Sequence, residues 1–203
     1  MGTSSGEIWW SRRKRAVAVS LVFVAAAVLS TISLLALHAI AMTPRRDLPT
    51  VSTGLGFVRL VRPANSISLP SLRGSGTIDL ARLAGKPIVM NFWSSSCYPC
   101  KQETPALASE ARAVGGKVTF LGIDTVDRRT AAMAFIRRYR VPYQVAFDPN
   151  ASAAGRYGVP GLPVTIFLSR SAKTVVGENI GALTQGKLRT ILRQLYGVTS
   201  PRG

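Results

Sequence analysis

The stretch that decides the fold is Asn91-Phe92-Trp93-Ser94-Ser95-Ser96-Cys97-Tyr98-Pro99-Cys100-Lys101. It contains the only two cysteines among 203 residues, in a Cys-x-x-Cys arrangement. A structural zinc site needs four ligands, usually Cys or His, and the single histidine is His38, inside an apolar stretch. Haem attachment needs a histidine directly after the second cysteine, where this chain has Lys101. Two interpretations stay open: a reversible dithiol/disulfide and an inert local disulfide.

The residues around the pair predict a junction between a strand and a helix. Residues 88–93 form a short apolar run, typical of a buried strand, and apolar residues recur at helical spacing from 107 to 114. The amides and the positive dipole end at a helix N-terminus stabilise a thiolate. We therefore predict that Cys97 is the nucleophile and that Cys100, one turn further on and more buried, resolves the mixed disulfide. Pro99 stiffens the turn, and the Tyr98-Pro99 dipeptide is expected to influence the redox potential.

Four stretches, in this order, resemble extracytoplasmic thioredoxins of the TlpA/ResA/DsbE type. Together they extend from Ala64 to Tyr196, about two-thirds of the chain. The first carries the pattern Asn-Phe-Trp-x-x-x-Cys-x-x-Cys-x-x-Glu-x-Pro. The four stretches are Asn91 to Pro105, Val118 to Asp124, Tyr139 to Pro149 and Tyr157 to Leu168.

The resemblance implies an α/β protein with a thioredoxin fold. Such a fold has a central mixed β-sheet flanked by helices, here with an N-terminal β-hairpin and a central helix-strand insertion. It also implies that Pro163 is a cis-proline that faces the dithiol. Leu162 then borders the groove where the substrate backbone docks, and Tyr98 and Pro99 complete the predicted substrate-binding residues.

Glu103 is the third catalytic residue that the resemblance implies. Plain thioredoxins carry a buried Asp six residues before the first cysteine, where this chain has Asn91, which cannot exchange a proton. In the TlpA/ResA/DsbE branch the acidic partner is the Glu three residues after the second cysteine, here Glu103, a candidate to take up the proton of the resolving thiol. The alternative for Glu103 is a first-turn acid that complements the helix dipole.

The resemblance further implies a disulfide reductase that acts on exported proteins. Its substrate would be the C-x-x-C-H disulfide of apocytochrome c, and its electron donor a membrane protein of the CcdA or DsbD type. No metal and no cofactor besides the Cys97-Cys100 disulfide is predicted. The same dithiol can work as an oxidase that introduces disulfides, and a non-catalytic thioredoxin-like chaperone is a third possibility.

The N-terminal quarter of the sequence indicates that the protein is exported. Residues 1–15 end in four basic residues and are expected in the cytoplasm, and residues 16–42 are predicted to be a transmembrane anchor or signal sequence. Ala16 to Leu37 lacks charge and is long enough to span a bilayer. The basic cluster before the span favours a single-pass protein with its N-terminus inside. Cleavage at Ala39-Ile40-Ala41 would instead release a secreted or periplasmic protein.

The remaining sequence divides into a linker, one domain and a tail. Residues 43–65 lack a clear period and predict a linker, residues 66–197 the thioredoxin-like domain and residues 198–203 a tail. Within the domain we expect a hairpin over 66–80, a helix over 128–139, a strand over 174–180 and a closing helix over 183–196. The net charge of +17 comes without any nucleic-acid-binding motif. We therefore expect protein partners and a membrane surface, and no nucleic acid.

Overall fold

The apolar run before the cysteines forms an inner strand of a seven-stranded sheet. The structure is a computed structural model, and it describes residues 56–200. The strand order is β1-β9-β8-β5-β6-β7, and β2 also pairs with β9. The strands of this sheet are β1 (Gly56–Val58), β2 (Arg62–Pro63), β5 (Ile88–Trp93), β6 (Thr119–Thr125), β7 (Gln144–Asp148), β8 (Val164–Leu168) and β9 (Thr174–Ile180).

The sheet is mixed, as predicted. β5, β6 and β7 run parallel, whereas β8 is antiparallel to β5 and β9 is antiparallel to β8. Parallel neighbours need crossover connections. The helices α2 (Tyr98–Ala113) and α3 (Arg129–Arg138) provide them, the first between β5 and β6 and the second between β6 and β7. The carboxyl end of β5 therefore leads through a short loop into α2, which places the cysteines beyond the carboxyl ends of the parallel strands.

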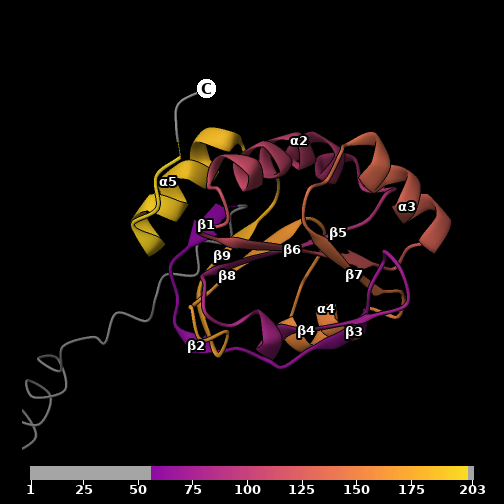
Figure 1. The fold of residues 1–203 in the computed structure, drawn as a ribbon, viewed down its shortest axis with the longest axis horizontal. Helices are drawn as coiled ribbons and strands as arrows, with labels where there is room; N and C mark the ends of the chain where they lie inside the picture. Colours follow the sequence, from indigo (N-terminus) through magenta and orange to yellow (C-terminus); the bar gives the residue numbers. More distant parts are fainter. Residues whose placement is uncertain (1–55, 201–203) are drawn as a thin grey trace, which may run out of the picture. The chain divides into compact units, whose positions relative to one another are not determined.

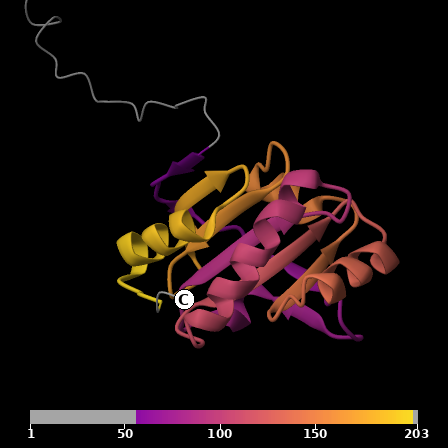
Figure 2. The same ribbon diagram turned by 90° about the horizontal axis from the view of Figure 1, so that it is seen from above.

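Helices cover one face of the sheet and a hairpin covers the other. In Figure 1, α2, α3 and α5 (Gln185–Tyr196) lie above the strands, and Figure 2 shows them across the sheet from above. Below the strands lie α4 (Ser152–Tyr157) and the antiparallel hairpin of β3 (Ser68–Pro70) and β4 (Thr77–Asp79). A short 3-10 helix, η1 (Leu80–Leu83), follows the hairpin.

The side chains of β5 alternate between the two faces, because successive residues of a strand point to opposite sides. Ile88, Met90 and Phe92 belong to the core between the sheet and the layer formed by the hairpin and α4. Trp93 belongs to the core on the opposite face and stacks on Phe135 of α3, with ring centroids 4.4 Å apart. Trp93 also approaches Gly122 closely. A Cβ added to Gly122 would lie only 2.9 Å from the indole nitrogen, so a side chain has no room there. Phe92 and Trp93 are thus core residues, as the sequence predicts.

The predicted elements are present with small differences in their bounds. The hairpin, the helix α3 and the last strand occupy the expected residues, and the closing helix begins at Gln185. Residues before the expected boundary at residue 66 also join the sheet, because β1 and β2 pair with β9. In the predicted tail, Val198 is buried against the core on the α5 side.

The predicted anchor over residues 16–42 lies outside the described residues, as do residues 43–55 of the predicted linker and the last three residues. Within residues 56–200, none of the helices has the length and apolar composition to cross a membrane.

Candidate active site

The two cysteines form a disulfide at the N-terminus of α2. The sulfur atoms of Cys97 and Cys100 are 2.06 Å apart. Cys97 is the N-cap residue of the helix, and its sulfur accepts a hydrogen bond of 3.2 Å from the backbone N–H of Cys100. Cys97 is half-buried, whereas Cys100 is completely buried. A partner protein can therefore reach the sulfur of Cys97 first, and that sulfur lies where helix amides stabilise a thiolate.

The loop before β8 contributes Leu162 and Pro163. The peptide bond between them is cis, as predicted. Leu162 and Cys97, both half-buried, pack against one apolar cluster that includes Trp93 and Cys100. Pro163 is buried and its carbonyl accepts a 2.9 Å hydrogen bond from the backbone N–H of Gly181. The fold thus brings Leu162 to the cluster beneath the dithiol, and the contact of Pro163 with a substrate stays a prediction.

The surface beside the disulfide is open and partly aromatic. Tyr98 and Pro99 are exposed, with 69% of Tyr98 accessible. A pocket of about 430 Å³ lies between the start of α2 and the helix α3. Its lining residues are Ser95, Lys101, Ala131, Ala134, Phe135, Arg138 and Tyr139. Ser95 and Lys101, on either side of the disulfide in the sequence, place this pocket next to the active-site segment.

Glu103 lies in a buried hydrogen-bond network on the helix face of the sheet. It is 1% exposed, and its Oε1 accepts a 2.8 Å hydrogen bond from Nδ2 of Asn91 on β5. Its Oε2 accepts a 2.9 Å hydrogen bond from the backbone N–H of Leu183, just before α5. Nδ2 of Asn91 also donates to Oγ1 of Thr165 on β8, at 3.0 Å. Glu103 therefore binds groups outside its own helix, which argues against a role confined to the dipole of α2.

Burial brings the pKa of Glu103 close to neutral pH. Removal from water raises the pKa of Glu103 to about 7, although the hydrogen bonds from Leu183 and Asn91 lower it. A group with a pKa near the working pH can both accept and release a proton. Glu103 is three residues after Cys100 on the same helix, one turn further along. The position and the pKa both suit a base that takes the proton of the resolving thiol.

Two acidic residues near the site were not among the predicted site residues. Asp127 accepts a 2.6 Å hydrogen bond on Oδ2 from the backbone N–H of Ser95, two residues before Cys97. Asp124 is completely buried at the end of β6, in register with Trp93 at the end of β5. A signal for both was available, because functional groups of parallel sheets gather at the carboxyl ends of the strands.

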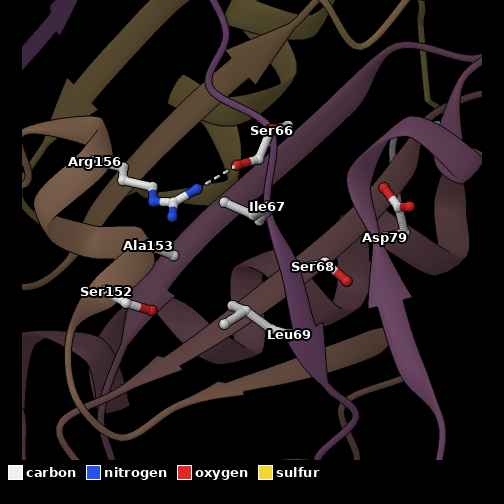
Figure 3. A pocket seen from close by; sticks show the side chains of 8 residues that line it. All are labelled: Ser66, Ile67, Ser68, Leu69, Asp79, Ser152, Ala153 and Arg156. Carbon is white, nitrogen blue, oxygen red and sulfur yellow. Dashed lines mark hydrogen bonds between the residues drawn. The ribbon is translucent and has the colours of Figure 1, made fainter.

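A second pocket, of about 320 Å³, lies between β3 and α4. Figure 3 shows its lining residues, among them Arg156, whose Nη1 donates a 3.3 Å hydrogen bond to the carbonyl of Ser66. This pocket contains neither cysteine and no buried titratable side chain. Among residues 56–200, no group of three or more His, Cys, Asp or Glu side chains is placed to hold a metal ion.

Comparisons with known proteins agree with this site. Residues 61–176 match the AhpC/TSA family. The thiol-disulfide oxidoreductase ResA of Bacillus anthracis is 31% identical over 121 residues, 58% of this chain and 68% of that protein. The thiol:disulfide interchange protein DsbE of Pseudomonas fluorescens biotype C is 30% identical over 137 residues, 66% of this chain and 74% of that protein.

A solved structure shows the same fold. It is a secreted disulfide oxidoreductase of Mycobacterium tuberculosis, described as homologous to DsbE of E. coli. It is 31% identical in sequence, with a TM-score of 0.58, and the match covers 64% of this chain and 96% of that one. The match therefore includes nearly all of that structure and about two-thirds of this chain.

Proposed function

The chain belongs to the AhpC/TSA family and is a thiol-disulfide oxidoreductase of the ResA and DsbE type, and we propose that it reduces disulfides of exported proteins. The observation that carries this proposal is the arrangement of the dithiol. An accessible Cys97 caps α2, and a completely buried Cys100 follows one turn later. The buried carboxyl of Glu103 lies one turn beyond Cys100 and titrates near neutral pH.

The proposed reaction begins with both cysteines reduced. The thiolate of Cys97 attacks one sulfur of a substrate disulfide, whose second sulfur leaves as a thiolate and takes up a proton. Glu103 then accepts the proton of Cys100, and the resulting thiolate attacks the sulfur of Cys97. This step releases the second substrate thiol and forms the Cys97-Cys100 disulfide that the structure contains. Two electrons have passed to the substrate, and a membrane electron donor of the CcdA or DsbD type restores the dithiol.

The proposed location is outside the cytoplasm, with residues 16–42 as the membrane anchor. The uncharged run over 16–37 and the basic cluster before it support an anchor with its N-terminus inside. Further support for a location outside the cytoplasm comes from the solved relative that is described as a secreted disulfide oxidoreductase. Apocytochrome c, with its C-x-x-C-H disulfide, is the proposed substrate. The exposed Tyr98-Pro99 dipeptide and the residues Leu162 and Pro163 are the proposed contacts.

A transfer experiment tests the function. The full chain is reduced with dithiothreitol, freed of the reagent and mixed with a peptide that carries a C-x-x-C-H disulfide. We expect one peptide disulfide to be reduced for each protein dithiol consumed, as measured by mass spectrometry after thiol trapping. Protein oxidised beforehand is the control and should reduce nothing. If the oxidised protein instead converts the reduced peptide to its disulfide, and the reduced protein leaves the disulfide intact, the reductase proposal is overturned in favour of an oxidase.

A further inference from the structure

Asp124 is a buried carboxyl without a conventional hydrogen-bond partner. Its side chain is completely buried, and within residues 56–200 neither carboxyl oxygen accepts a hydrogen bond from an N–H or O–H donor. Burial of an unpaired carboxylate carries a large energetic cost. Such a group avoids the cost when it holds a proton, and it can then donate a hydrogen bond itself. The surroundings of Asp124 must therefore supply an acceptor.

Asp124 has three charged neighbours, Asp127, Arg129 and Asp148. Asp148, at the end of β7, accepts hydrogen bonds from the hydroxyl of Ser152 at 2.8 Å and from two backbone N–H groups of α4, each at 3.1 Å. Arg129 of α3 donates to the carbonyls of Ser71 and Leu72, at 3.0 and 2.9 Å. The third neighbour is Asp127, whose carboxyl lies close enough to that of Asp124 to raise its pKa.

The charges around Asp124 favour its protonated form. Burial is the largest cause, and together with the negative charge of Asp127 it raises the pKa of Asp124 to about 8. The hydrogen bond to Asp127 and the charge of Asp148 act in the same direction, whereas Arg129 lowers the pKa. A pKa of about 8 keeps most Asp124 side chains protonated at pH 7, and the neighbouring carboxyl of Asp127 is the group placed to accept a hydrogen bond from that proton.

Asp127 connects this pair to the active-site loop. Its Oδ2 accepts the 2.6 Å hydrogen bond from the backbone N–H of Ser95, and its Oδ1 accepts a 2.7 Å hydrogen bond from the backbone N–H of Arg128. Ser95 lies in the three-residue loop between β5 and Cys97. The same loop is closed by a 3.3 Å hydrogen bond from the N–H of Cys97 to the carbonyl of Ser94. The position of Asp127 thus fixes the approach of the chain to the nucleophile.

We propose that Asp124 and Asp127 form an acid–carboxylate pair that positions Cys97 through Ser95. Asp124 is a positioning residue, because it acts through Asp127 and does not touch the reacting sulfur. Loss of its proton would place two negative charges side by side in a buried site and weaken the hold on the loop. The inference rests on the thiol-disulfide chemistry of the chain but not on the direction of the reaction. It predicts that turnover declines as the pH rises through about 8.

The raised pKa of Asp124 also makes the folding stability depend on pH. The pKa of Asp124 is about 8 in the folded state, against 3.8 for an unperturbed Asp. The folded state therefore holds one proton more than the unfolded state between these values, so the contribution of Asp124 to stability falls as the pH rises through that window. Asp124→Asn removes this part of the pH dependence, because Asn does not titrate.

The test compares Asp124→Asn with the unchanged full chain. Turnover of a disulfide peptide is measured from pH 6 to pH 9, with unfolding by urea measured in parallel. Because protonated Asp124 declines to about a tenth one pH unit above its pKa, wild-type turnover should fall about tenfold from pH 7 to pH 9. Asp124→Asn should keep its activity at pH 7, since the amide can donate to Asp127, and should lose the alkaline decline. Asp79→Asn is the matched control, because it makes the same charge change at the start of η1, and it should keep the decline.

Several results would contradict the proposal that Asp124 and Asp127 act as a pair. One is an alkaline decline that persists in Asp124→Asn, and another is a folded Asp124→Asn that is inactive at pH 7. If Asp124→Asn does not fold, the variant Asp127→Asn provides the test. Without the negative charge of Asp127, the alkaline decline in turnover should move to lower pH or vanish. An unchanged decline would contradict the proposed pair. If the unchanged chain exchanges no disulfide at any pH, the oxidoreductase function itself has failed, which is a distinct result.

Discussion

Cys97→Ser is expected to lose all thiol-disulfide exchange, whereas Cys100→Ser is expected to stop after the first step and accumulate a mixed disulfide with the substrate. The reason is the difference in accessibility, since Cys97 is half-buried at the start of α2 and Cys100 is completely buried behind it. Without Cys100 the bond between Cys97 and the substrate has no internal thiolate to break it. Non-reducing gels and mass spectrometry of the trapped complex measure both effects.

The control for these variants is their folding. The disulfide joins residues only three positions apart, so it constrains the unfolded state little and its loss should cost little stability. Both variants should therefore unfold cooperatively. A Cys100→Ser variant that turns over like the unchanged chain would contradict the assigned roles. So would a mixed disulfide that forms through Cys100 in Cys97→Ser. If the double variant Cys97→Ala, Cys100→Ala kept the cellular phenotype intact, the chaperone alternative would replace the enzyme.

Glu103→Gln is expected to slow the resolving step by about 100-fold, at the lower end of what a general base contributes. In the unchanged chain the rate of this step should rise through about pH 7, because Glu103 becomes a carboxylate there and can accept the proton of Cys100. Gln cannot accept that proton, so the rise should disappear. Stopped-flow measurement of mixed-disulfide decay, from pH 5.5 to pH 8.5, gives the rate directly.

Stability separates this effect from unfolding. The pKa of Glu103 is about 7 in the folded state against 4.5 for an unperturbed Glu, so its contribution to stability falls as the pH rises between these values. Glu103→Gln should lose that slope and remain folded above pH 7. Glu110→Gln is the matched control, since Glu110 is equally buried on α2 but pairs with Arg189 at 3.0 Å. It should lose stability and keep the pH dependence of the resolving step, and a Glu103→Gln variant that keeps this dependence would remove Glu103 from the reaction.

The sequence predicts the inner part of the fold because the signals there are local. The apolar run of β5, the helical spacing after Cys97 and the serines between them lie within about 25 residues of each other. They define the strand-to-helix junction and the order of the two cysteines. The cis bond before Pro163 was available only through the family resemblance, since an X-Pro dipeptide has no local signal that selects the cis form.

The missed features depend on contacts between distant parts of the chain. β1 and β2 have three and two residues, too few for a recognisable alternation, and they exist because β9 offers them an edge. The burial of Glu103 depends on Leu183, 80 residues away in the sequence. The sequence marks Asp124 only as the last residue of a family-like strand, because its lack of donors and its charged neighbours Asp127, Arg129 and Asp148 depend on the folded arrangement.

The reduction potential of the full chain in detergent is the measurement that tests the proposed direction of electron flow most directly. The protein is equilibrated with glutathione or dithiothreitol buffers of known composition, and free thiols are trapped and counted by mass spectrometry. A dithiol that donates electrons to exported proteins should have a potential near that of thioredoxin, about −270 mV, or lower. A potential near that of DsbA, about −120 mV, would make the chain an oxidase and contradict the proposal that it reduces its substrates.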